Sequence, residues 1–453
     1  MRIVVFGTGK AYRENRDRFD GEDEIVAFLD NDQKKQGGFL DHIAVHPPEN
    51  ISDLDYEKII IMSDFAVEMR RQLLALGCEA DTLIHYREYF SGKIKAVVPK
   101  DFVCAEGEKS CLIITFTLGY HGGAMVAVYA ARELIQRGYK VTIAAPDGNA
   151  LFIEEFQKTG IKFIVNRDLP YLKWNQLEWA ATFEKIIVNT YPMVLCALEI
   201  GKHRPVSLWL HESDNIYPTM QYWIERIREG VFEKNIKLYA VSNNARQNFI
   251  NNVTACDIEI LPYGIPDTGE CAKGKGEILR FAVIGSIHPI KQQLFLLQTL
   301  AAMAEEKMDK AEFIIIGRAE DAEYAQRVYA MADAMERVQV AGELQRREMD
   351  MVYRQIDVVV IPSIYEALSI VATEAMMNGK ICVISDNTGN AGFITSGENG
   401  FVFRNGDQED LSEKIVWCIE HRDRLREIGE NARKVYEANF TMKKMGDRLV
   451  QLP

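Results

Sequence analysis

The sequence lacks several patterns that would place it in a particular class of protein. Its 53 Lys and Arg residues are outnumbered by 66 Asp and Glu residues, so the formal net charge is −13 and there is no basic excess. A nucleic-acid-binding protein needs a basic surface to neutralise phosphates, and we therefore expect no nucleic-acid partner. None of the eight cysteines forms a C-x-x-C pair, and no group of His and Cys has the spacing of metal ligands. The sequence thus predicts no metal site.

Long apolar runs are also missing. The N-terminus, Met1–Gly7, has too short an apolar run for a signal peptide. The segment Cys111–Ala131 carries no formal charge, but Gly119, Gly122 and Gly123 interrupt it, and a strand, a turn and a helix explain it better than a membrane span. Cysteines in apolar segments are typical of reduced thiols in a cytoplasmic protein, which is the location we expect. Peripheral contact with the inner face of the membrane stays open, because the net charge does not exclude a local basic patch.

Three stretches of the chain begin with the same pattern. In each, a buried-type strand is followed by a turn that contains glycine and then by a helical pattern. The stretches are Ile3–Lys10, Cys111–Gly123 and Arg280–Lys291. Strands that alternate with helices imply parallel sheets, and 453 residues suffice for about three domains. The sequence therefore predicts an α/β protein built from Rossmann-like modules.

Polar stretches separate these modules. Lys100–Lys109 has the composition of a linker, and Pro262–Gly276, rich in Gly, Pro and charge, is a candidate hinge. The chain after about Arg422 is helical in pattern and breaks near Asn439–Thr441.

The first glycine turn, Gly7-Thr-Gly9, resembles the dinucleotide-binding fingerprint, with Asp30 about twenty residues on. Tyr12 replaces the third glycine, and its side chain would crowd the helix against the strand. A structural or partner-docking module therefore explains residues 1–97 better than an active nicotinamide-dependent oxidoreductase, which remains an alternative. Asp30 and Asp32 also form a D-x-D pair of the kind that holds a divalent cation in some sugar transferases. They lie far in sequence from the other candidate residues, and we interpret them as a turn.

The most informative stretch runs from Glu366 to Glu374, two carboxylates eight positions apart. It follows an apolar run, Val358–Ile361, and a break at Pro362–Ser363, so the predicted order is buried strand, turn and helix. Ligands of open α/β sheets bind at the carboxyl ends of strands, where Glu366 falls. Eight helical residues would place Glu374 ~12 Å along roughly the same side. A nucleotide-sugar between them would put sugar hydroxyls at Glu366, the diphosphate at the turn and ribose hydroxyls at Glu374.

The turn itself could hold a phosphate. The amides of Leu368 and Ser369 would have no intrahelical partners there, which suits an anion. A plainer interpretation is that Glu366 matches the helix dipole and Glu374 is an exposed surface residue. The neighbouring segments favour the ligand site over this alternative.

Three further candidates lie where strands end. Gly122-Gly123 opens the first helix of the second module, where paired glycines let the backbone approach a ligand or simply form a tight turn. His211 ends the strand Val206–Leu210 and begins a polar cluster; a lone His is more often structural, so its position carries the argument. Lys291, after Gly285, could neutralise a diphosphate leaving group or be a solvated surface side chain.

Three segments together resemble glycosyltransferase family 4, which has the GT-B fold and retains the anomeric configuration. These segments are Gly285–Lys291, Pro362–Gly379 and Glu398–Phe403. The likeness covers about residues 110–453 and implies two facing Rossmann-like domains with parallel sheets. An acceptor-side domain would comprise residues 108–265 plus about 430–453, and a donor-binding domain residues 275–429. Residues 1–97 lie outside the likeness and are expected to form an additional N-terminal Rossmann-like domain.

The resemblance also implies roles for single residues. Glu366 would contact the transferred sugar, His211 would lie beside it, and Lys291 would bind the diphosphate; these three are the catalytic candidates. Glu374 would contact the ribose. The other donor-binding candidates are Gly122, Gly123, Ser286, Arg318, Leu344, Ala367, Leu368 and Ser369. Among these, the two glycines would form the loop facing donor and acceptor. Leu368 and Ser369 would offer backbone amides, and Leu344 would lie near the base.

Two positions depart from the family pattern. The family often has Arg after the glycine that Gly285 matches, whereas this chain has Ser286, so one phosphate cation is missing and Arg318 is the candidate substitute. The glycine usual after the first Glu is here Ala367.

These residues predict a metal-independent, hexosyltransferase-like enzyme. It would move a sugar from a nucleotide-diphosphate-sugar to a glycan, lipid-linked or protein acceptor, in cell-surface polysaccharide or glycoconjugate synthesis. No cofactor is expected beside the donor substrate, because helix N-termini and Lys291 would hold the diphosphate charge. Two alternatives stay open. One is a non-catalytic GT-B scaffold subunit that docks a protein partner through residues 1–97, which the loss of Arg at Ser286 motivates. The other is a sugar-nucleotide epimerase.

Overall fold

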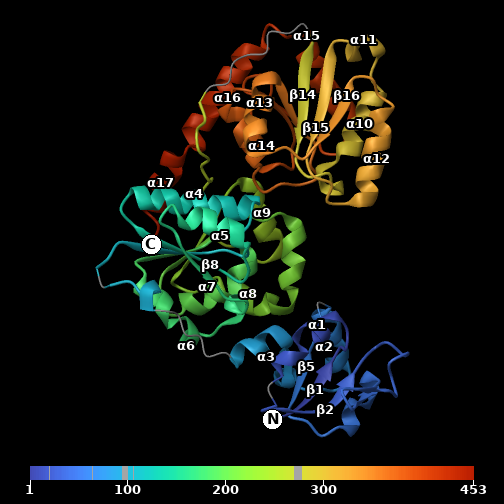
Figure 1. Ribbon diagram of the computed structural model, residues 1–453, viewed down its shortest axis with the longest axis vertical. Helices are drawn as coiled ribbons and strands as arrows, with labels where there is room; N and C mark the ends of the chain where they lie inside the picture. Colours follow the sequence, from blue (N-terminus) through green and yellow to red (C-terminus); the bar gives the residue numbers. More distant parts are fainter. Residues whose placement is uncertain (20, 64, 94–99, 106, 270–277) are drawn as a thin grey trace.

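The computed structural model describes residues 1–19, 21–63, 65–93, 100–105, 107–269 and 278–453. Its strands form three sheets that follow one another along the chain, each with helices against it (Figure 1). The α/β class expected from alternating strands and helices is therefore confirmed. The expected linker at Lys100–Lys109 and hinge at Pro262–Gly276 fall partly outside the described residues, at position 106 and at positions 270–276.

The first sheet, in what we call the N-terminal body, has the strand order β3-β4-β2-β1-β5-β6. Its strands pair in parallel except β3 with β4. The strands are β1 (Arg2–Phe6), β2 (Glu24–Leu29), β3 (Phe39–Leu40), β4 (Ile43–His46), β5 (Lys58–Ile61) and β6 (Leu83–His85); the helices are α1 (Lys10–Asn15), α2 (Ala66–Ala75) and α3 (Tyr86–Gly92), with short 3-10 turns at η1 (Arg16–Arg18), η2 (Pro48–Asp53) and η3 (Ala80–Thr82).

The second sheet, in the middle body, is fully parallel with the order β13-β12-β11-β10-β7-β8-β9. Near-continuous apolar strands such as β7 and β11 are buried along their whole length, as expected of a parallel sheet covered on both faces. The strands are β7 (Ser110–Ile114), β8 (Lys140–Ala145), β9 (Lys162–Val165), β10 (Lys185–Val188), β11 (Val206–Leu210), β12 (Ile236–Ala240) and β13 (Ile258–Ile260); the helices are α4 (Gly122–Gln136), α5 (Ala150–Gln157), α6 (Trp174–Leu177), α7 (Val194–Gly201), α8 (Ile224–Gly230) and α9 (Asn243–Asn252).

The third sheet, in the C-terminal body, is also parallel, with the order β16-β15-β14-β17-β18-β19. Its strands are β14 (Leu279–Ile284), β15 (Ala311–Ile316), β16 (Val338–Gly342), β17 (Val358–Ile361), β18 (Ile381–Ser385) and β19 (Phe401–Phe403); the helices of this part of the chain are α10 (Gln293–Ala301), α11 (Glu305–Met308), α12 (Ala322–Asp333), α13 (Arg346–Gln355), α14 (Ile370–Met377), α15 (Gln408–Glu420), α16 (Leu425–Asn439) and α17 (Met442–Leu449).

The chain crosses back at its C-terminal end. α16 runs from the C-terminal body towards the middle body, and α17 lies against α4 (Figure 1). Asp447 of α17 accepts a hydrogen bond from Arg137 Nη2 at 2.8 Å, and Met445 and Leu449 are buried in the core of the middle body. The break between α16 and α17 falls at Phe440–Thr441, as the sequence predicted.

The N-terminal body docks on the middle body through α3. Ser91 Oγ donates to Tyr171 O at 3.0 Å, and Gln176 Nε2 donates to Ser91 O at 2.9 Å. Arg226 pairs with Glu88 at 3.0 Å. These two hydrogen bonds and this ion pair hold α3 against the middle body.

Candidate active site

The segment between β17 and α14 forms a polar cluster at the carboxyl edge of the third sheet. β17 ends at Ile361 and α14 begins at Ile370, so Glu366 lies in the connecting loop. Glu366 Oε1 accepts hydrogen bonds from Ser363 Oγ at 2.7 Å and from Lys291 Nζ at 2.5 Å. The Glu366 side chain is 13% exposed and that of Lys291 30%. Two of the three catalytic candidates are thus joined in one ion pair.

The ion pair keeps Glu366 charged. Burial alone would raise the pKa of Glu366, but the Lys291 ammonium and hydrogen bonds from Ser363 and Ser369 hold this pKa below its ordinary value. An ionised carboxylate only accepts hydrogen bonds, so Glu366 is suited to bind hydroxyl groups. The cluster combines an acceptor for hydroxyls with a cation that can also face an anion.

The start of α14 differs from the sequence expectation in two ways. The expectation that eight helical residues separate Glu366 from Glu374 is wrong, because the helix begins only at Ile370 and Ser369 is its N-cap residue. The amide of Ser369, expected to be free for a phosphate, donates to Asn390 Oδ1 at 2.6 Å. Ser369 is 2% exposed, and a buried N–H needs a partner within the protein.

The charges of both carboxylates nevertheless act on one side chain, Tyr263. Burial raises the pKa of Tyr263 well above its ordinary value, and the charges of Glu366 and Glu374 raise it further. Glu374 itself is half-buried, and its Oε2 accepts a hydrogen bond from Tyr353 OH of α13 at 3.0 Å. Tyr263 is therefore within electrostatic reach of both acidic groups, although they do not share a helix.

The middle body contacts the loop that carries Glu366. Tyr263 OH donates to Leu368 O at 3.0 Å, and Ser242 Oγ donates to Ala367 O. Gly122, the first residue of α4, also lies close, because a Cβ placed on it would be 3.5 Å from Ile370 Cδ1. The loop thus lies where the second and third sheets' bodies meet.

A second polar cluster follows β11. The ring of His211 stacks on Tyr263 with centroids 6.3 Å apart, and its Nε2 has no hydrogen-bond partner among the described residues. Burial lowers the pKa of His211 to about 3, so the imidazole is neutral at physiological pH. The neighbouring Glu212 is 6% exposed and accepts hydrogen bonds from Thr190 Oγ at 2.6 Å and from the amide of His211 at 2.7 Å. Burial outweighs these bonds and raises the pKa of Glu212 to about 7.

A cavity of about 730 Å³ opens beside this second cluster. The middle body contributes Gly123, His211 and Glu212 to its lining, and the N-terminal body contributes His85 and Arg87. Gly123 and His211, two of the sequence candidates, therefore share one cavity.

Three donor-binding candidates lie at the ends of β14, β15 and β16. The carbonyl of Ser286 accepts a hydrogen bond from Gln293 Nε2 at 2.8 Å. The Arg318 side chain is 64% exposed and pairs with Glu320 at 3.1 Å. Leu344 follows β16 and is half-buried. Within the described residues Arg318 makes no hydrogen bond or ion pair with the Lys291–Glu366 cluster, so the structure does not join it to that cluster.

The carboxylate of Asp30 is hydrogen-bonded by residues of the same N-terminal body. Asp30 accepts hydrogen bonds from the amide of Thr8 at 3.0 Å and from Lys35 Nζ at 2.9 Å. Tyr12, in the place of a third glycine, packs edge-on against Phe28 with centroids 5.0 Å apart. These contacts agree with the interpretation of the D-x-D pair as a turn.

Two kinds of feature are absent from the described part of the chain. No group of three or more His, Cys, Asp and Glu side chains is arranged to hold a metal ion. No described helix combines the length and apolar character that crossing a membrane requires. The cysteines in the described ranges are free thiols, and Cys111, Cys196, Cys382 and Cys418 are buried.

Comparison with protein families decides the assignment of the second and third sheets. Residues 120–268 match the family model for Glycosyltransferase Family 4, and residues 274–435 match that for Glycosyl transferases group 1. This part of the chain belongs to glycosyltransferase family 4. Residues 1–84 match a separate family model described as C2185-like, N-terminal.

Solved structures of glycosyltransferases share the fold. The crystal structure of Anabaena Alr3699/HepE in complex with UDP aligns with a TM-score of 0.65 and 18% identity, over 76% of this chain and 98% of HepE. WaaG, a glycosyltransferase involved in lipopolysaccharide biosynthesis, aligns with a TM-score of 0.57 and 15% identity, over 75% of this chain and 98% of WaaG. The GT-B fold expected from the sequence is confirmed.

Curated relatives match over shorter stretches. The trehalose synthase of Thermococcus litoralis is 33% identical over 106 residues, which are 23% of this chain and 25% of the relative. The D-inositol 3-phosphate glycosyltransferase of Nocardia farcinica is 26% identical over 157 residues, which are 33% of this chain and 35% of the relative. The chain therefore matches only a quarter to about a third of the length of these relatives.

Sequence reasoning missed four residues of the site. Ser242, Tyr263 and Asn390 bind the backbone of the loop from Ala367 to Ser369, and Glu212 carries a raised pKa beside His211. Only Glu212 had a usable signal, since it stands in the polar run that His211 begins.

Proposed function

We propose that this glycosyltransferase is a retaining enzyme that uses a nucleotide-diphosphate-sugar donor. Its acceptor is a glycan, a lipid-linked sugar or a protein, and its place is in cell-surface polysaccharide or glycoconjugate synthesis. The site is proposed to work without a metal or a resident cofactor, in the cytoplasm or at the inner face of the membrane. Support for the donor class comes from the HepE structures, which contain UDP or UDP-glucose.

The observation that carries the proposal is the ion pair between Lys291 and Glu366. It sets a buried, ionised carboxylate beside a cation at the carboxyl ends of β14 and β17. A sugar diphosphate presents hydroxyl donors next to a doubly charged leaving group, so this pair matches both halves of such a donor. Lys291 would turn from Glu366 to the diphosphate, while Glu366 binds the sugar hydroxyls.

The proposed step exchanges one glycosidic bond for another. The bond from the anomeric carbon to the diphosphate oxygen breaks, and the acceptor oxygen attacks the same face of the sugar. The acceptor proton passes to the departing diphosphate oxygen, so no protein nucleophile is needed. Lys291 stabilises the leaving-group charge, and neutral His211 is available to hydrogen-bond the reacting sugar through Nε2.

Donor hydrolysis and thermal stabilisation test the proposal. The purified chain is screened against nucleotide sugars, beginning with UDP-glucose; we expect one of them to raise the melting temperature and to release its nucleoside diphosphate slowly. Glu366→Gln should lower this release, whereas Glu398→Gln, in an exposed turn of the same body, should leave it unchanged. A chain that neither binds nor hydrolyses any nucleotide sugar would contradict the proposal.

The same assay separates the alternatives. Binding without hydrolysis or transfer, in the presence of an acceptor panel, would favour a non-catalytic scaffold. Conversion of the donor into an epimer, detected by product analysis, would favour an epimerase.

A further inference from the structure

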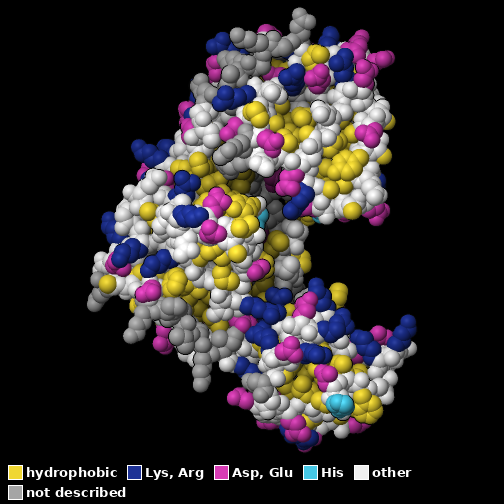
Figure 2. Space-filling model, in the orientation of Figure 1, with side chains coloured by type: hydrophobic (Ala, Val, Ile, Leu, Met, Phe, Trp, Pro, Cys, Tyr) yellow, Lys and Arg dark blue, Asp and Glu magenta, His cyan; other side chains and the backbone are white. Residues whose placement is uncertain are grey.

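The N-terminal body forms part of the cleft, although it lies outside the family 4 match, which begins at residue 120. His85 and Arg87, where β6 meets α3, line the cavity of about 730 Å³ that His211 also lines, which we call the His211 cavity. Figure 2 shows the molecule hollowed on one side, between the N-terminal and C-terminal bodies. Two bodies, and not the middle body alone, therefore build the walls beside His211.

A second cavity, of about 570 Å³, lies where the N-terminal and middle bodies meet, and we call it the junction cavity. The two cavities adjoin, because the same four residues line both: Arg87, Phe116, Thr117 and Tyr171. Each cavity alone has a volume within the range of about 300–1,000 Å³ that is usual for small-molecule sites. A ligand of more than one sugar unit therefore has room to extend from His211 to the N-terminal body.

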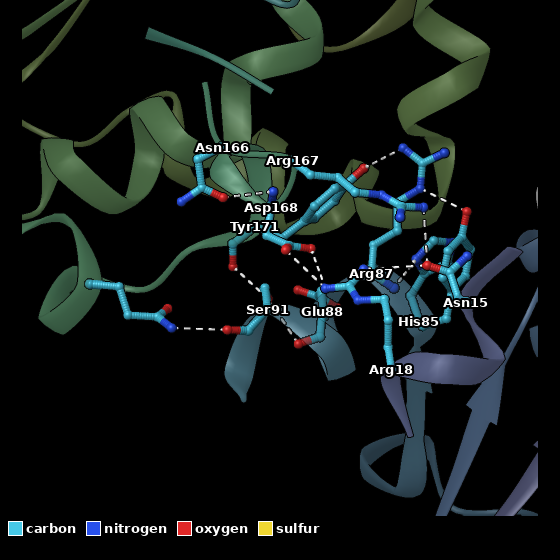
Figure 3. Close-up of polar contacts among 12 residues, drawn as sticks. Asn15, Arg18, His85, Arg87, Glu88, Ser91, Asn166, Arg167, Asp168 and Tyr171 are labelled. Carbon is cyan, nitrogen blue, oxygen red and sulfur yellow. Dashed lines mark hydrogen bonds and ion pairs between the residues drawn. The ribbon is translucent and has the colours of Figure 1, made fainter. Parts of the chain in front are cut away.

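The junction cavity offers both strong hydrogen-bond donors and strong acceptors. Its lining contains three guanidinium groups and three carboxylates: Arg18, Arg87, Arg167, Glu14, Asp147 and Asp168. Arg18 Nη2 donates to the two oxygens of Asp168, at 2.8 and 2.9 Å (Figure 3). Asn15 Oδ1 accepts from Arg18 Nη1 at 3.3 Å and from Arg167 Nη2 at 3.1 Å. Sugar hydroxyls both donate and accept, so a lining that mixes the two kinds of charged group suits them better than it suits an ion of one sign.

Aromatic rings line the passage from one cavity to the other. Phe116, which follows β7 and lines both cavities, is 46% exposed. Tyr171 also lines both, and its ring centroid lies 5.2 Å from that of Trp223 in the His211 cavity. The ring of His85, from the N-terminal body, lies 4.8 Å from the same tryptophan. One face of a pyranose ring presents C–H groups that pack on aromatic rings, while its hydroxyls reach polar groups around them. The lining therefore provides both kinds of contact that a sugar chain needs.

We infer that the acceptor is an oligosaccharide chain that fills both cavities. Its terminal sugar, which receives the transferred unit, lies beside His211, and its second sugar lies in the junction cavity between Phe116 and the N-terminal body. The inference rests on the proposed function and adds to it the length of the acceptor and a role for residues 1–97, which is to bind the second sugar. A role of this kind explains why the N-terminal body docks through residues that also line the cleft.

Matched saccharides of one and two units test the inference. A printed panel carries glucose, galactose, mannose and N-acetylglucosamine, each alone and as the terminal unit of disaccharides, and the full chain is applied with UDP present. Each bound pair is then titrated in solution by saturation-transfer NMR. We expect the disaccharide to bind about tenfold more tightly than its terminal sugar alone, which is the effect of about one additional hydrogen bond. Equal affinity within the bound pairs, or no binding to any saccharide, would overturn the inference.

Variants assign the second sugar to the junction cavity. Phe116→Ala removes the exposed ring, and Glu14→Trp narrows the cavity from the N-terminal body; each should reduce the advantage of the disaccharide several-fold. Phe232→Ala and Arg13→Trp are the matched controls, because Phe232 and Arg13 are exposed and line neither cavity. Both affinities are measured on the same variant, so partial unfolding lowers both and leaves their ratio unchanged. An advantage that survives in both Phe116→Ala and Glu14→Trp would contradict this placement.

Donor hydrolysis without any saccharide separates the two claims, since it depends on the Lys291–Glu366 cluster. A wild-type chain that hydrolyses no nucleotide sugar would contradict the proposed function. A chain that hydrolyses its donor but binds one and two sugar units equally would contradict the inference alone.

Discussion

Glu366 and Glu212 are both largely shielded from solvent, but their pKa values are shifted in opposite directions. Glu366 has Lys291 beside it, and its pKa is lowered. Glu212 receives hydrogen bonds from Thr190 and from the amide of His211, and its pKa is raised to about 7. One neighbouring cation therefore decides whether a buried carboxyl at a strand end stays ionised, because neutral hydrogen bonds do not offset the loss of hydration.

The two sheet edges therefore suit different chemical groups of a substrate. The third sheet's edge holds a fixed pair of opposite charges and suits a charged donor. The second sheet's edge holds a neutral imidazole and a carboxyl that changes charge near neutral pH, and suits hydroxyl chemistry. Five experiments distinguish the two sheet edges or test the contacts on which they depend.

The largest effect is expected from Lys291→Met. Without the ammonium, the developing charge of the leaving group loses its stabilising cation, and donor turnover should fall by about 10²–10³-fold. The pKa of Glu366 should rise as well, since its partner is gone. Lys310→Met, an exposed lysine of the same body, is the control. Steady-state release of nucleoside diphosphate measures the effect, and a loss smaller than twofold would remove Lys291 from the proposed site.

The next effect concerns the pH dependence of stability. Because the folded pKa of Glu212 is raised, the folded state holds its proton longer than the unfolded chain, and stability falls as pH rises from about 4.5 through 7. The loss should amount to roughly 2–4 kcal/mol. Urea unfolding at several pH values should give a smaller fall in Glu212→Gln than in the wild type. Parallel curves for the two proteins would show that Glu212 is not the group responsible.

Gly389→Ala probes the loop that carries Glu366, which lies where the middle and C-terminal bodies meet. A Cβ at this position would lie 1.7 Å from Ala367 O and 2.6 Å from Ser242 Oγ, so the loop that carries Glu366 must shift. We expect a loss of about 1–3 kcal/mol in the free energy of unfolding. Gly392→Ala is the matched control, since its Cβ would meet nothing closer than 3.9 Å. Equal stability of both variants would contradict the close approach of Gly389 to Ala367 and Ser242.

A smaller effect is expected from Glu374→Ala. Loss of an acceptor for the ribose hydroxyls should weaken UDP-glucose binding about tenfold, measured by calorimetry. Tyr353→Phe removes the hydrogen bond to Glu374 but keeps the carboxylate, and its donor affinity should match the wild type. Unchanged binding in Glu374→Ala would argue against the ribose contact.

The smallest change is expected from chelation. If Lys291 and backbone groups hold the diphosphate charge, turnover should be the same in excess EDTA and in added Mg²⁺. Turnover that stops in EDTA and returns with a divalent cation would contradict a metal-independent site.

The pattern of apolar residues along the sequence predicted much of the fold. Apolar runs such as Val206–Leu210 and Val358–Ile361 predicted buried strands because both faces of each sheet are covered, and β11 and β17 occupy those runs. The short edge strands β9, β13 and β19 gave too little pattern to be recognised. The end of α16 at Asn439 was readable from the polar break that follows it.

The site was harder to predict than the fold. Strand-end placement pointed to Glu366, His211 and Lys291, but pairing of Lys291 with Glu366 joins residues 75 positions apart and depends on tertiary packing. The amide of Ser369 was misjudged for the same reason, because Asn390 reaches it from 21 positions away. Local rules describe which groups a helix leaves unpaired, but not which distant side chain binds them.

The return of α17 to α4 bears on how the protein is made. Arg137, at the end of α4, leaves the ribosome about 300 residues before its partner Asp447. At typical elongation rates of about 5–20 residues per second, the middle body waits tens of seconds for the segment that covers α4. During synthesis the surface of α4 that α17 contacts stays uncovered, so chaperones that act on nascent chains have access to it.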